Sequence, residues 1–507
     1  MSSTSRTAQS LKNIFSGIGS QLFLTIISFY TTRIIKLSLG FEYLGLNGVF
    51  GNVISLLSLT ELGIGTAIVF ALYKPLAEND TELICSLMRF YRNAYRIIAA
   101  VVFSIGLLLL PFLKLFVHTT LSIDYVRISF LLFVVNSALS YLLSYKRNLI
   151  YADQKNYIIT LYSLTFSFVS KIGQLVVFSI TKNYLLYLCV TIVCTVGLNL
   201  LLSWKADQMY PFLNKTDVSP LSSDIKSMLI TKVKAVFLHS IGSKVVFATD
   251  NILIAYFLGV TTVGKYTAYM TIVTFISSLT QQFLSGITSS VGNYIVEHNT
   301  QERYDLFRKI EFASTILSIF SCVCLAVLLN PFISWWLGSD TLLSQETVYL
   351  LVLSNWIIFI RRPVYTVKSA AGLFEQDKYA PLVESVINLL ASCVLVQFIG
   401  LPGIILGTII GEVAVPLWVG ARVIYTHLFN RKSYEFLLRV IMYLLITVAL
   451  TACIQYVNSK LYVYNDTVTL LLYFVTAIAV CSVVELLLFF KSLYFKYFID
   501  AFFKRKI

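Results

Sequence analysis

Residues 39–45 read LGFEYLG and residues 258–264 read LGVTTVG, so the chain contains one short sequence pattern twice. The same shift of 219 residues aligns three pairs of identical residues: Glu78 with Glu297, Thr81 with Thr300, and Arg89 with Arg308. Farther along, QKNY at 154–157 aligns with QDKY at 376–379. We interpret the chain as two fused copies of one hydrophobic unit. Duplicated halves in membrane proteins commonly face one another across a transport pathway, so transport is the leading hypothesis.

The composition indicates a membrane protein. Hydrophobic residues make up 57% of the chain, charged residues make up 13%, and the mean hydropathy is +0.80, all far from the values of soluble proteins. A helix needs about 20 apolar residues to cross a bilayer. We therefore expect an all-α polytopic fold with fourteen spanning helices, at 13–38, 44–72, 95–117, 126–150, 157–180, 184–204, 228–258, 263–295, 310–337, 346–371, 380–399, 402–425, 436–457 and 467–490.

The distribution of basic residues predicts the orientation, because short cytoplasmic loops retain Lys and Arg. With both termini inside, the predicted outer side holds only six of the 39 Lys and Arg residues: Lys36, Lys114, Arg127, Lys182, Lys265 and Lys460. The net charge of +14 is then largely a topology signal, and no nucleic-acid partner is needed to explain it. The first helix lacks a small-residue cleavage site and is expected to be a signal-anchor.

The repeat divides the chain into four parts. We expect a first lobe of six helices at 1–204, a cytoplasmic linker at 205–227, a second lobe of six helices at 228–430, and two extra helices with a basic tail at 431–507. The eight cysteines lie almost entirely in predicted helices, where they behave as small apolar residues, so no metal or redox site is expected.

Seven basic residues remain once those assigned to the two membrane faces are counted: Arg33, Lys171, Lys232, Lys234, Lys244, Arg361 and Arg362. Each costs about 3 kcal/mol at a helix centre, so these side chains should face protein or water instead of lipid. Arg33, Lys232 and Lys234 are close enough to helix ends to reach the interface, which is the alternative reading for them.

Polar side chains recur at helical spacing. Lys232, Ser243 and Asp250 follow one line of the seventh helix, and Ser278 and Gln281 belong to a long stripe on the eighth. The second helix carries Asn47 and Glu61 on one face. Such stripes line either a close helix–helix contact or a wet cavity. Asp250 and Glu61 either pair with the basic groups or carry a coupling proton or sodium ion.

A positive, hydroxyl-rich cavity suits an anionic ligand that carries sugars. Arg and Lys neutralise phosphate oxygens, while hydroxyl and amide side chains exchange hydrogen bonds with sugar hydroxyls. The candidate ligand-binding residues are Arg33, Lys232, Lys234, Lys244, Arg361, Arg362, Asn47, Gln281 and Ser278.

Several enzyme classes are excluded by missing motifs. The stretch GVTTVGK at 259–265 imitates a phosphate-binding loop, but Tyr266 replaces the required Ser or Thr, and apolar helices flank it. We expect this stretch to form a turn between two helices. Because no H-E-x-x-H or G-x-S-x-G motif is present, we expect no catalysis and no cofactor. The energy for transport must then come from a gradient or from the concentration difference of the substrate itself.

Two motifs carry a family resemblance. LGFEYLGLNGVF at 39–50 and LTELGIGTAIVFALYKPLAENDTE at 59–82 resemble bacterial Wzx-like polysaccharide flippases of the O-antigen and capsule type. These belong to the multidrug/oligosaccharidyl-lipid/polysaccharide (MOP) superfamily, together with the MATE multidrug exporters and the lipid II flippase. The resemblance covers the first twelve helices; a count of fourteen departs from the polysaccharide branch and matches the lipid II flippase.

The resemblance implies two pseudo-symmetric six-helix lobes in a V shape. It also implies alternating access that moves an undecaprenyl-pyrophosphate-linked oligosaccharide from the inner to the outer leaflet of the bacterial cytoplasmic membrane, for surface polysaccharide export. The implied partners are the lipid-linked oligosaccharide, membrane lipid, and the polymerase and glycosyltransferases of the same pathway.

Two alternatives remain open. A multidrug exporter of the same fold would cause dye efflux and no glycan defect. A membrane polymerase or transferase acting on lipid-linked sugars would need a catalytic base in a sizeable outer loop, and the predicted outer loops are short and nearly devoid of acids.

Overall fold

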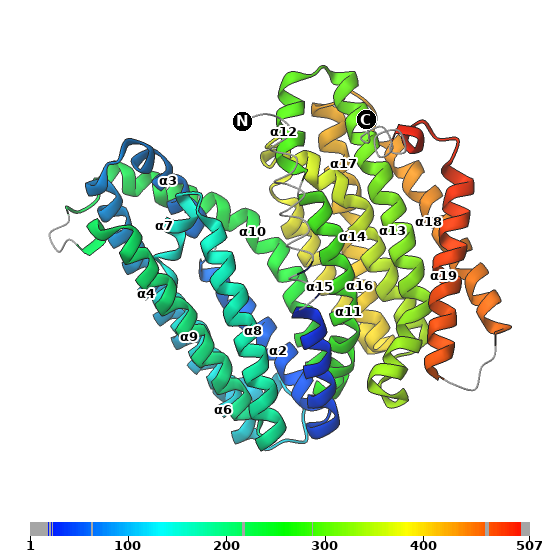
Figure 1. Ribbon diagram of the computed structural model, residues 1–507, viewed down its shortest axis with the longest axis horizontal. Coiled ribbons are helices and arrows are strands. Elements are labelled where there is room, and N and C mark those ends of the chain that lie inside the picture. The colour runs from blue at the N-terminus through cyan, green and yellow to red at the C-terminus, as the bar shows by residue number, and fades with distance from the viewer. Residues whose placement is uncertain are drawn as a thin grey trace. The chain divides into compact units, whose positions relative to one another are not determined.

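The computed structural model describes residues 19, 22, 24–61, 64–214, 219–285, 287–461 and 466–497. These residues form helices joined by short turns, and no strand occurs among them (Figure 1). Ten of the described helices are long and apolar enough to cross a membrane, by length and composition. The other four predicted spans coincide with a helix over 24–39, with α2 (Phe41–Leu57) and α3 (Ile64–Glu78), with α10 (Ser223–Leu258) and with α11 (Val260–Ser285). The all-α polytopic prediction is confirmed.

The helices form two compact units. One unit is Ser20–Gly264, and the other is Lys265–Ile507 together with Met1–Gly19. The boundary between the units lies inside α11, and α10 contacts α2 and α3. The packing units therefore differ from the repeat boundaries at 204 and 228, because α10 packs with the helices that precede it.

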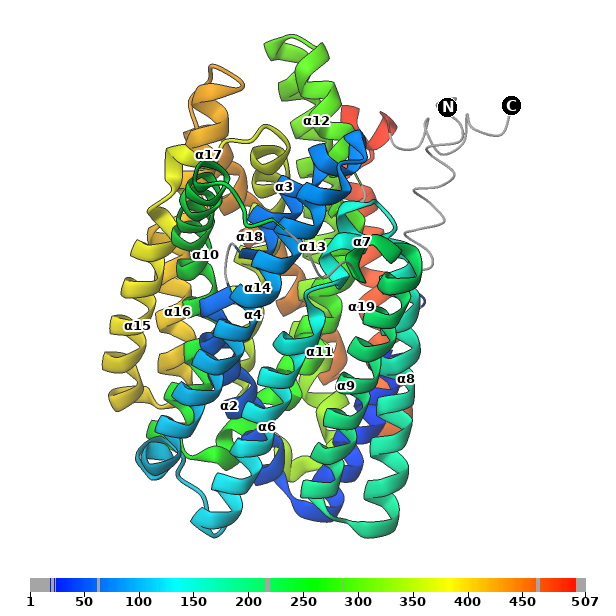
Figure 2. The same cartoon turned by 90° about the vertical axis from the view of Figure 1, so that its left-hand side faces the viewer.

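The Ser20–Gly264 unit is built around four long helices. Contacts connect α4 with α6, α6 with α9, and α8 with α9, and Figures 1 and 2 show α8 and α9 side by side. Its remaining elements are η1 (Ser58–Glu61), α4 (Thr81–Leu109), η2 (Leu110–Phe112), α5 (Leu113–Phe116), α6 (Ile123–Ser144), α7 (Arg147–Ala152), α8 (Asn156–Thr181), α9 (Tyr184–Met209) and η3 (Pro211–Asn214).

In the Lys265–Ile507 unit, α13 contacts α14, α18 and α19, and α13 and α14 are equally deeply buried. Gly400 has a φ of 65°, a conformation that favours glycine, and separates α15 from α16. Gly403 and Gly407 let these two helices pack closely, and Figure 1 shows them side by side. The unit's other elements are α12 (Thr288–Glu297), α13 (Thr300–Leu337), η4 (Ser339–Thr341), α14 (Gln345–Ala370), η5 (Glu375–Asp377), α15 (Ala380–Ile399), α16 (Leu401–Ala414), α17 (Pro416–His427), α18 (Tyr434–Ser459) and α19 (Asp466–Phe489).

The two sequence copies have the same local structure. Gly40 precedes α2 with a φ of 93°, and Gly259 precedes α11 with a φ of 85°, a conformation that favours glycine. Gly259 thus forms the turn between α10 and α11, whereas the rest of the predicted turn at 259–265 already belongs to α11. At the next equivalent pair, Asp80 caps α4 and Asn299 caps α13, each through its side-chain oxygen.

The repeated glycines also explain a close helix contact. A Cβ on Gly45 would lie less than 3.0 Å from the carbonyl oxygen of Val260, and a Cβ on Gly264 would lie equally close to that of Phe41. Under the shift of 219 residues, Gly45 corresponds to Gly264 and Phe41 to Val260. The starts of α2 and α11 therefore pack reciprocally, and the LGxxxxG pattern is kept because this contact has no room for a side chain.

Candidate functional site

A pocket of about 610 Å³ lies in the Ser20–Gly264 unit, where α3, α4, α6 and α7 meet. Its volume is within the usual range for small-molecule sites. Acidic, basic, amide, hydroxyl and aromatic side chains all contribute to its wall. The lining residues are Glu61, Gly65, Val69, Phe70, Tyr73, Tyr95, Ser144, Arg147, Asn148 and Tyr151.

Hydrogen bonds hold the acid of this pocket in place. The Tyr95 hydroxyl donates to Glu61 Oε1, and the Asn148 side-chain amide donates to the Tyr91 hydroxyl. The Tyr91 and Tyr95 rings meet edge to face with their centroids 4.4 Å apart. Within the described part of the chain, no Lys or Arg forms an ion pair with Glu61. Glu61 is therefore a positioned carboxylate that faces a pocket.

The backbone at Glu61 differs from the sequence prediction. The predicted continuous helix over 44–72 is wrong, because α2 ends at Leu57 and a 3-10 turn occupies Ser58–Glu61 before α3 begins. The Ser58 hydroxyl donates to the backbone oxygen of Ser55 at 2.6 Å. Such side-chain to backbone hydrogen bonds compete with the regular helical pattern, which favours a break here.

A second polar cluster lies in the Lys265–Ile507 unit, on α14. Arg361 Nη1 lies 3.8 Å from Glu384 Oε1 on α15. Arg362 Nη1 donates to the backbone oxygen of Ser277 at 2.8 Å, and Arg362 Nη2 donates to the Ser277 hydroxyl. The Arg362 guanidinium also lies 4.5 Å from the Phe359 ring centroid. Among the described side chains no acid pairs with Arg362, so neutral groups hold this cation.

The other predicted ligand-binding residues are dispersed. Asn47 accepts a hydrogen bond from the Tyr184 hydroxyl at 3.0 Å, and the Ser278 hydroxyl donates to the backbone of its own helix. Gln281, Arg33 and Lys234 are exposed, and Asp250 is half-buried. The side chains of Lys232 and Lys244 lie outside the described residues. Ligand binding by these residues, and ion coupling through Asp250 or Glu61, stay predictions.

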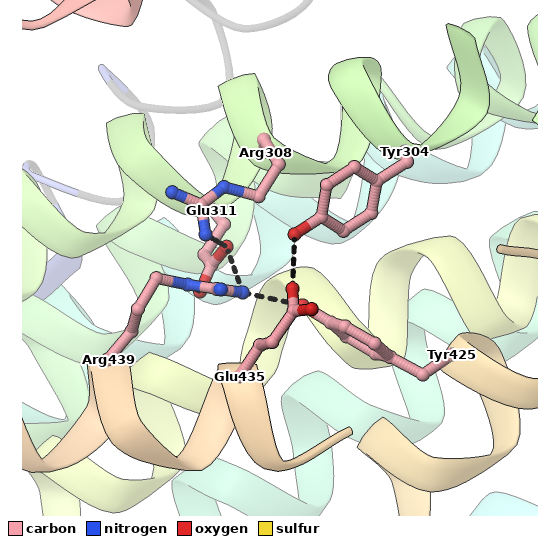
Figure 3. Close-up of polar contacts among 6 residues, drawn as sticks. All are labelled: Tyr304, Arg308, Glu311, Tyr425, Glu435 and Arg439. Atoms are coloured by element: carbon pink, nitrogen blue, oxygen red, sulfur yellow. Dashed lines mark hydrogen bonds and ion pairs between the residues drawn. The ribbon is translucent and has the colours of Figure 1, made fainter. Parts of the chain in front are cut away.

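A buried ion-pair network that the sequence did not predict joins α13, α17 and α18 (Figure 3). Arg439 on α18 binds both carboxylate oxygens of Glu311 on α13, at 3.0 and 3.1 Å. Arg308 lies 3.5 Å from the same carboxylate, and the Tyr304 hydroxyl donates to Glu435 at 3.1 Å. Glu311 is 1% exposed. This network attaches the first of the two extra helices to the second repeat.

A local signal for the network was available in the sequence. Arg308 and Glu311 are three residues apart, which places them on one helix face. Arg308 lies outside the predicted span 310–337, but α13 begins at Thr300, so this residue lies in a helix. Arg439 lies in the predicted span 436–457 and in α18, which begins at Tyr434. Their long side chains reach a carboxylate that is buried at the helix ends.

The chain was compared with protein families, curated proteins and solved structures. The sequence matches no protein-family model and no curated protein. Among solved structures, the lipid II flippase MurJ in an inward closed conformation is similar with a TM-score of 0.62 and 14% identity, over 93% of this chain and 98% of that chain. An inward-facing multidrug resistance MATE family transporter of the MOP superfamily is similar with a TM-score of 0.61 and 14% identity, over 84% and 98%.

A further similar structure is the MATE multidrug transporter DinF-BH in complex with R6G, with a TM-score of 0.58 and 16% identity, over 84% of this chain and 96% of that chain. All three similar structures belong to transporters or flippases, and none belongs to an enzyme. At these identities the likeness concerns the fold alone. The chain has the fold shared by the MATE transporters and the MurJ lipid II flippase.

Proposed function

We propose that this protein is a flippase for an anionic lipid that carries an oligosaccharide, with an undecaprenyl-pyrophosphate-linked repeat unit as the substrate. Arg362 is the observation that carries this proposal. Its guanidinium lies within an apolar spanning helix, and its partners among the described residues include a serine hydroxyl, a backbone oxygen and an aromatic ring. A cation in such a place gains strongly from an anionic ligand, because charge-assisted hydrogen bonds to phosphate are stronger than those to neutral acceptors.

The membrane potential supports the direction of transport. Moving negative charge outward across an inside-negative membrane is favoured by about 2.3 kcal/mol per charge per 100 mV. Headgroup transfer to the outer leaflet is then driven without nucleotide hydrolysis, in line with the missing phosphate-binding motif. A proton or sodium ion carried by Glu61 or Asp250 is the competing scheme.

Export of aromatic cations is the second candidate function, and the Glu61 pocket favours it. A carboxylate with the aromatic side chains of Phe70, Tyr73 and Tyr151 around it suits a flat organic cation. Arg147 in the same wall opposes this reading, because it offsets the charge of Glu61.

A translocation assay tests the proposal. The full chain is reconstituted into vesicles that contain a fluorescent undecaprenyl-pyrophosphate disaccharide, and an impermeant quencher reports the fraction of headgroups on each leaflet. We expect the wild type to equilibrate the lipid, Arg362→Gln to slow it by about tenfold or more, and Lys460→Gln, at an exposed position, to match the wild type.

Two results would contradict the proposal. Equal rates for Arg362→Gln and the wild type would remove the assigned role of Arg362. Transport of R6G without any movement of the labelled lipid would replace the flippase by the cation exporter.

A further inference from the structure

We propose that the pocket around Glu61 is a saccharide subsite that binds one or more sugar residues of the transported headgroup. This inference rests on the proposed function and names where the sugars bind. The pocket lies entirely within the Ser20–Gly264 unit.

The charge of the pocket wall favours an uncharged polar ligand. Among the described residues of the wall, Glu61 and Arg147 are the charged ones, and their formal charges cancel. Ser144, Asn148 and the tyrosine hydroxyls add groups that donate and accept hydrogen bonds. Sugar hydroxyls also donate and accept, so they match a wall of mixed polarity better than a phosphate or an organic cation does.

The aromatic residues of the pocket provide apolar surfaces on which a sugar ring can pack. Phe70, Tyr73 and Tyr151 line the pocket and are all exposed. Their rings offer apolar area with little conformational entropy to lose, and tyrosine adds a polar edge. The C–H faces of a sugar ring can pack on such rings while its hydroxyls reach Glu61 and Asn148.

The pocket is built before any ligand arrives. Tyr95 holds Glu61, and the buried Tyr91 and Tyr95 rings support each other. A Cβ on Gly65 would lie 3.4 Å from the Tyr91 hydroxyl and 3.5 Å from Asn148 Nδ2, so a larger side chain at this position would fill space beside the polar groups. Preorganisation of this kind lowers the entropy lost on binding.

The position of the pocket along the chain agrees with loading from inside. Its wall includes residues just before the α3–α4 turn and residues of α7, and both regions lie on the predicted cytoplasmic side. A headgroup presented at the inner leaflet would therefore meet this pocket.

Binding of free sugars tests the subsite. The full chain in lipid nanodiscs is titrated with soluble hexoses, N-acetylhexosamines, hexuronic acids and short oligosaccharides, and saturation-transfer NMR reports binding. We expect at least one of these probes to bind, and we expect Glu61→Gln and Tyr151→Ala to weaken it by about tenfold. Tyr157→Ala is the matched control, because Tyr157 is 71% exposed and does not line the pocket.

The outcomes separate this inference from the proposed function. Lipid translocation with no sugar binding, or with sugar binding that Glu61→Gln and Tyr151→Ala leave unchanged, would overturn the subsite and keep the flippase. Glu61-dependent binding of R6G with no sugar binding would overturn the subsite and make the pocket a cation site. Loss of binding in Tyr157→Ala as well would overturn the assignment to these side chains.

Discussion

Glu61 and Glu311 are both ionisable residues at polar sites between helices, but their surroundings differ. Glu311 is 1% exposed and is bound by Arg308 and by both nitrogens of an Arg439 fork. Glu61 accepts a hydrogen bond from Tyr95, has no described basic ion-pair partner, and faces a pocket. The difference shows that a carboxylate in buried ion pairs stabilises the fold, whereas a carboxylate that lines a pocket can also bind a ligand.

The two sequence copies show the same contrast. A shift of 222 residues aligns Ser140 with Arg362 and Lys146 with Lys368. Lys146 pairs with Asp207 at the end of α9, and Lys368 pairs with Asp377 in η5, so the ion pair persists while its partner comes from a different place. The duplication has kept turns, caps and helix ends, and the polar interior has diverged.

Glu311→Gln and Glu61→Gln test the comparison most strongly. Removing the Glu311 charge leaves two arginines without their shared partner, so we expect a loss of about 3–5 kcal/mol in the free energy of unfolding. Glu61→Gln should cost less than about 1 kcal/mol, because no described ion pair is broken. Thermal unfolding in nanodiscs measures both, with the exposed Glu346→Gln as the control. Equal losses in the free energy of unfolding for Glu61→Gln and Glu311→Gln would contradict the different roles assigned to the two carboxylates.

Lys368→Met and Lys146→Met compare equivalent positions in the two copies. The Asp377 side chain is 6% exposed and the Asp207 side chain is 29% exposed. Leaving Asp377 unpaired should lower the free energy of unfolding by about 3 kcal/mol. Leaving Asp207 unpaired should lower it by about 1 kcal/mol, because water solvates the more exposed carboxylate. Chemical denaturation gives the free energy of unfolding of each variant. A larger loss for Lys146→Met than for Lys368→Met would contradict the expectation that the more buried ion pair contributes more.

Gly45→Ala and Gly264→Ala test the reciprocal contact between the repeated glycines. A methyl group at either position would overlap a backbone oxygen, so we expect each variant to lose about 1–3 kcal/mol. Gly51 is also on α2 but has no atom within 4 Å of a Cβ position, so Gly51→Ala should gain up to about 1 kcal/mol. Similar losses in the free energy of unfolding for Gly45→Ala and Gly264→Ala would support the reciprocal packing. Two variants as stable as the wild type would refute it.

The smallest expected effect concerns Asp153 in the turn before α8. Burial would raise the pKa of Asp153, but hydrogen bonds from Lys155 and Tyr210 outweigh it and hold the pKa below the usual value of 3.8. The resulting stability is present above that usual value and is lost as the pH falls through the lower folded pKa. Stability measured from pH 6 to pH 3 should therefore fall slightly less in Asp153→Asn, by well under about 1 kcal/mol. An unchanged slope would show that these hydrogen bonds do not favour the ionised form.

The helices could be predicted more fully than the site. Apolar runs and basic loops determine where helices lie in a membrane, and each of the fourteen predicted spans contains helix among its described residues. The break at Ser58–Glu61 was missed because one hydroxyl-to-backbone hydrogen bond leaves the apolar pattern of 44–72 unchanged. The pocket was missed for a similar reason, since its wall joins residues as far apart as Glu61 and Tyr151.

The sequence by itself determined that this chain is helical, membrane-spanning and internally duplicated, because hydropathy and repeated turn residues are local properties. Only the tertiary structure decided which charged groups are satisfied. Arg439 completes the site of Glu311, Glu384 meets Arg361, and Tyr95 holds Glu61. Each of these partners comes from a different helix, so helix packing decides whether an ionisable residue is part of the scaffold or remains open to a ligand.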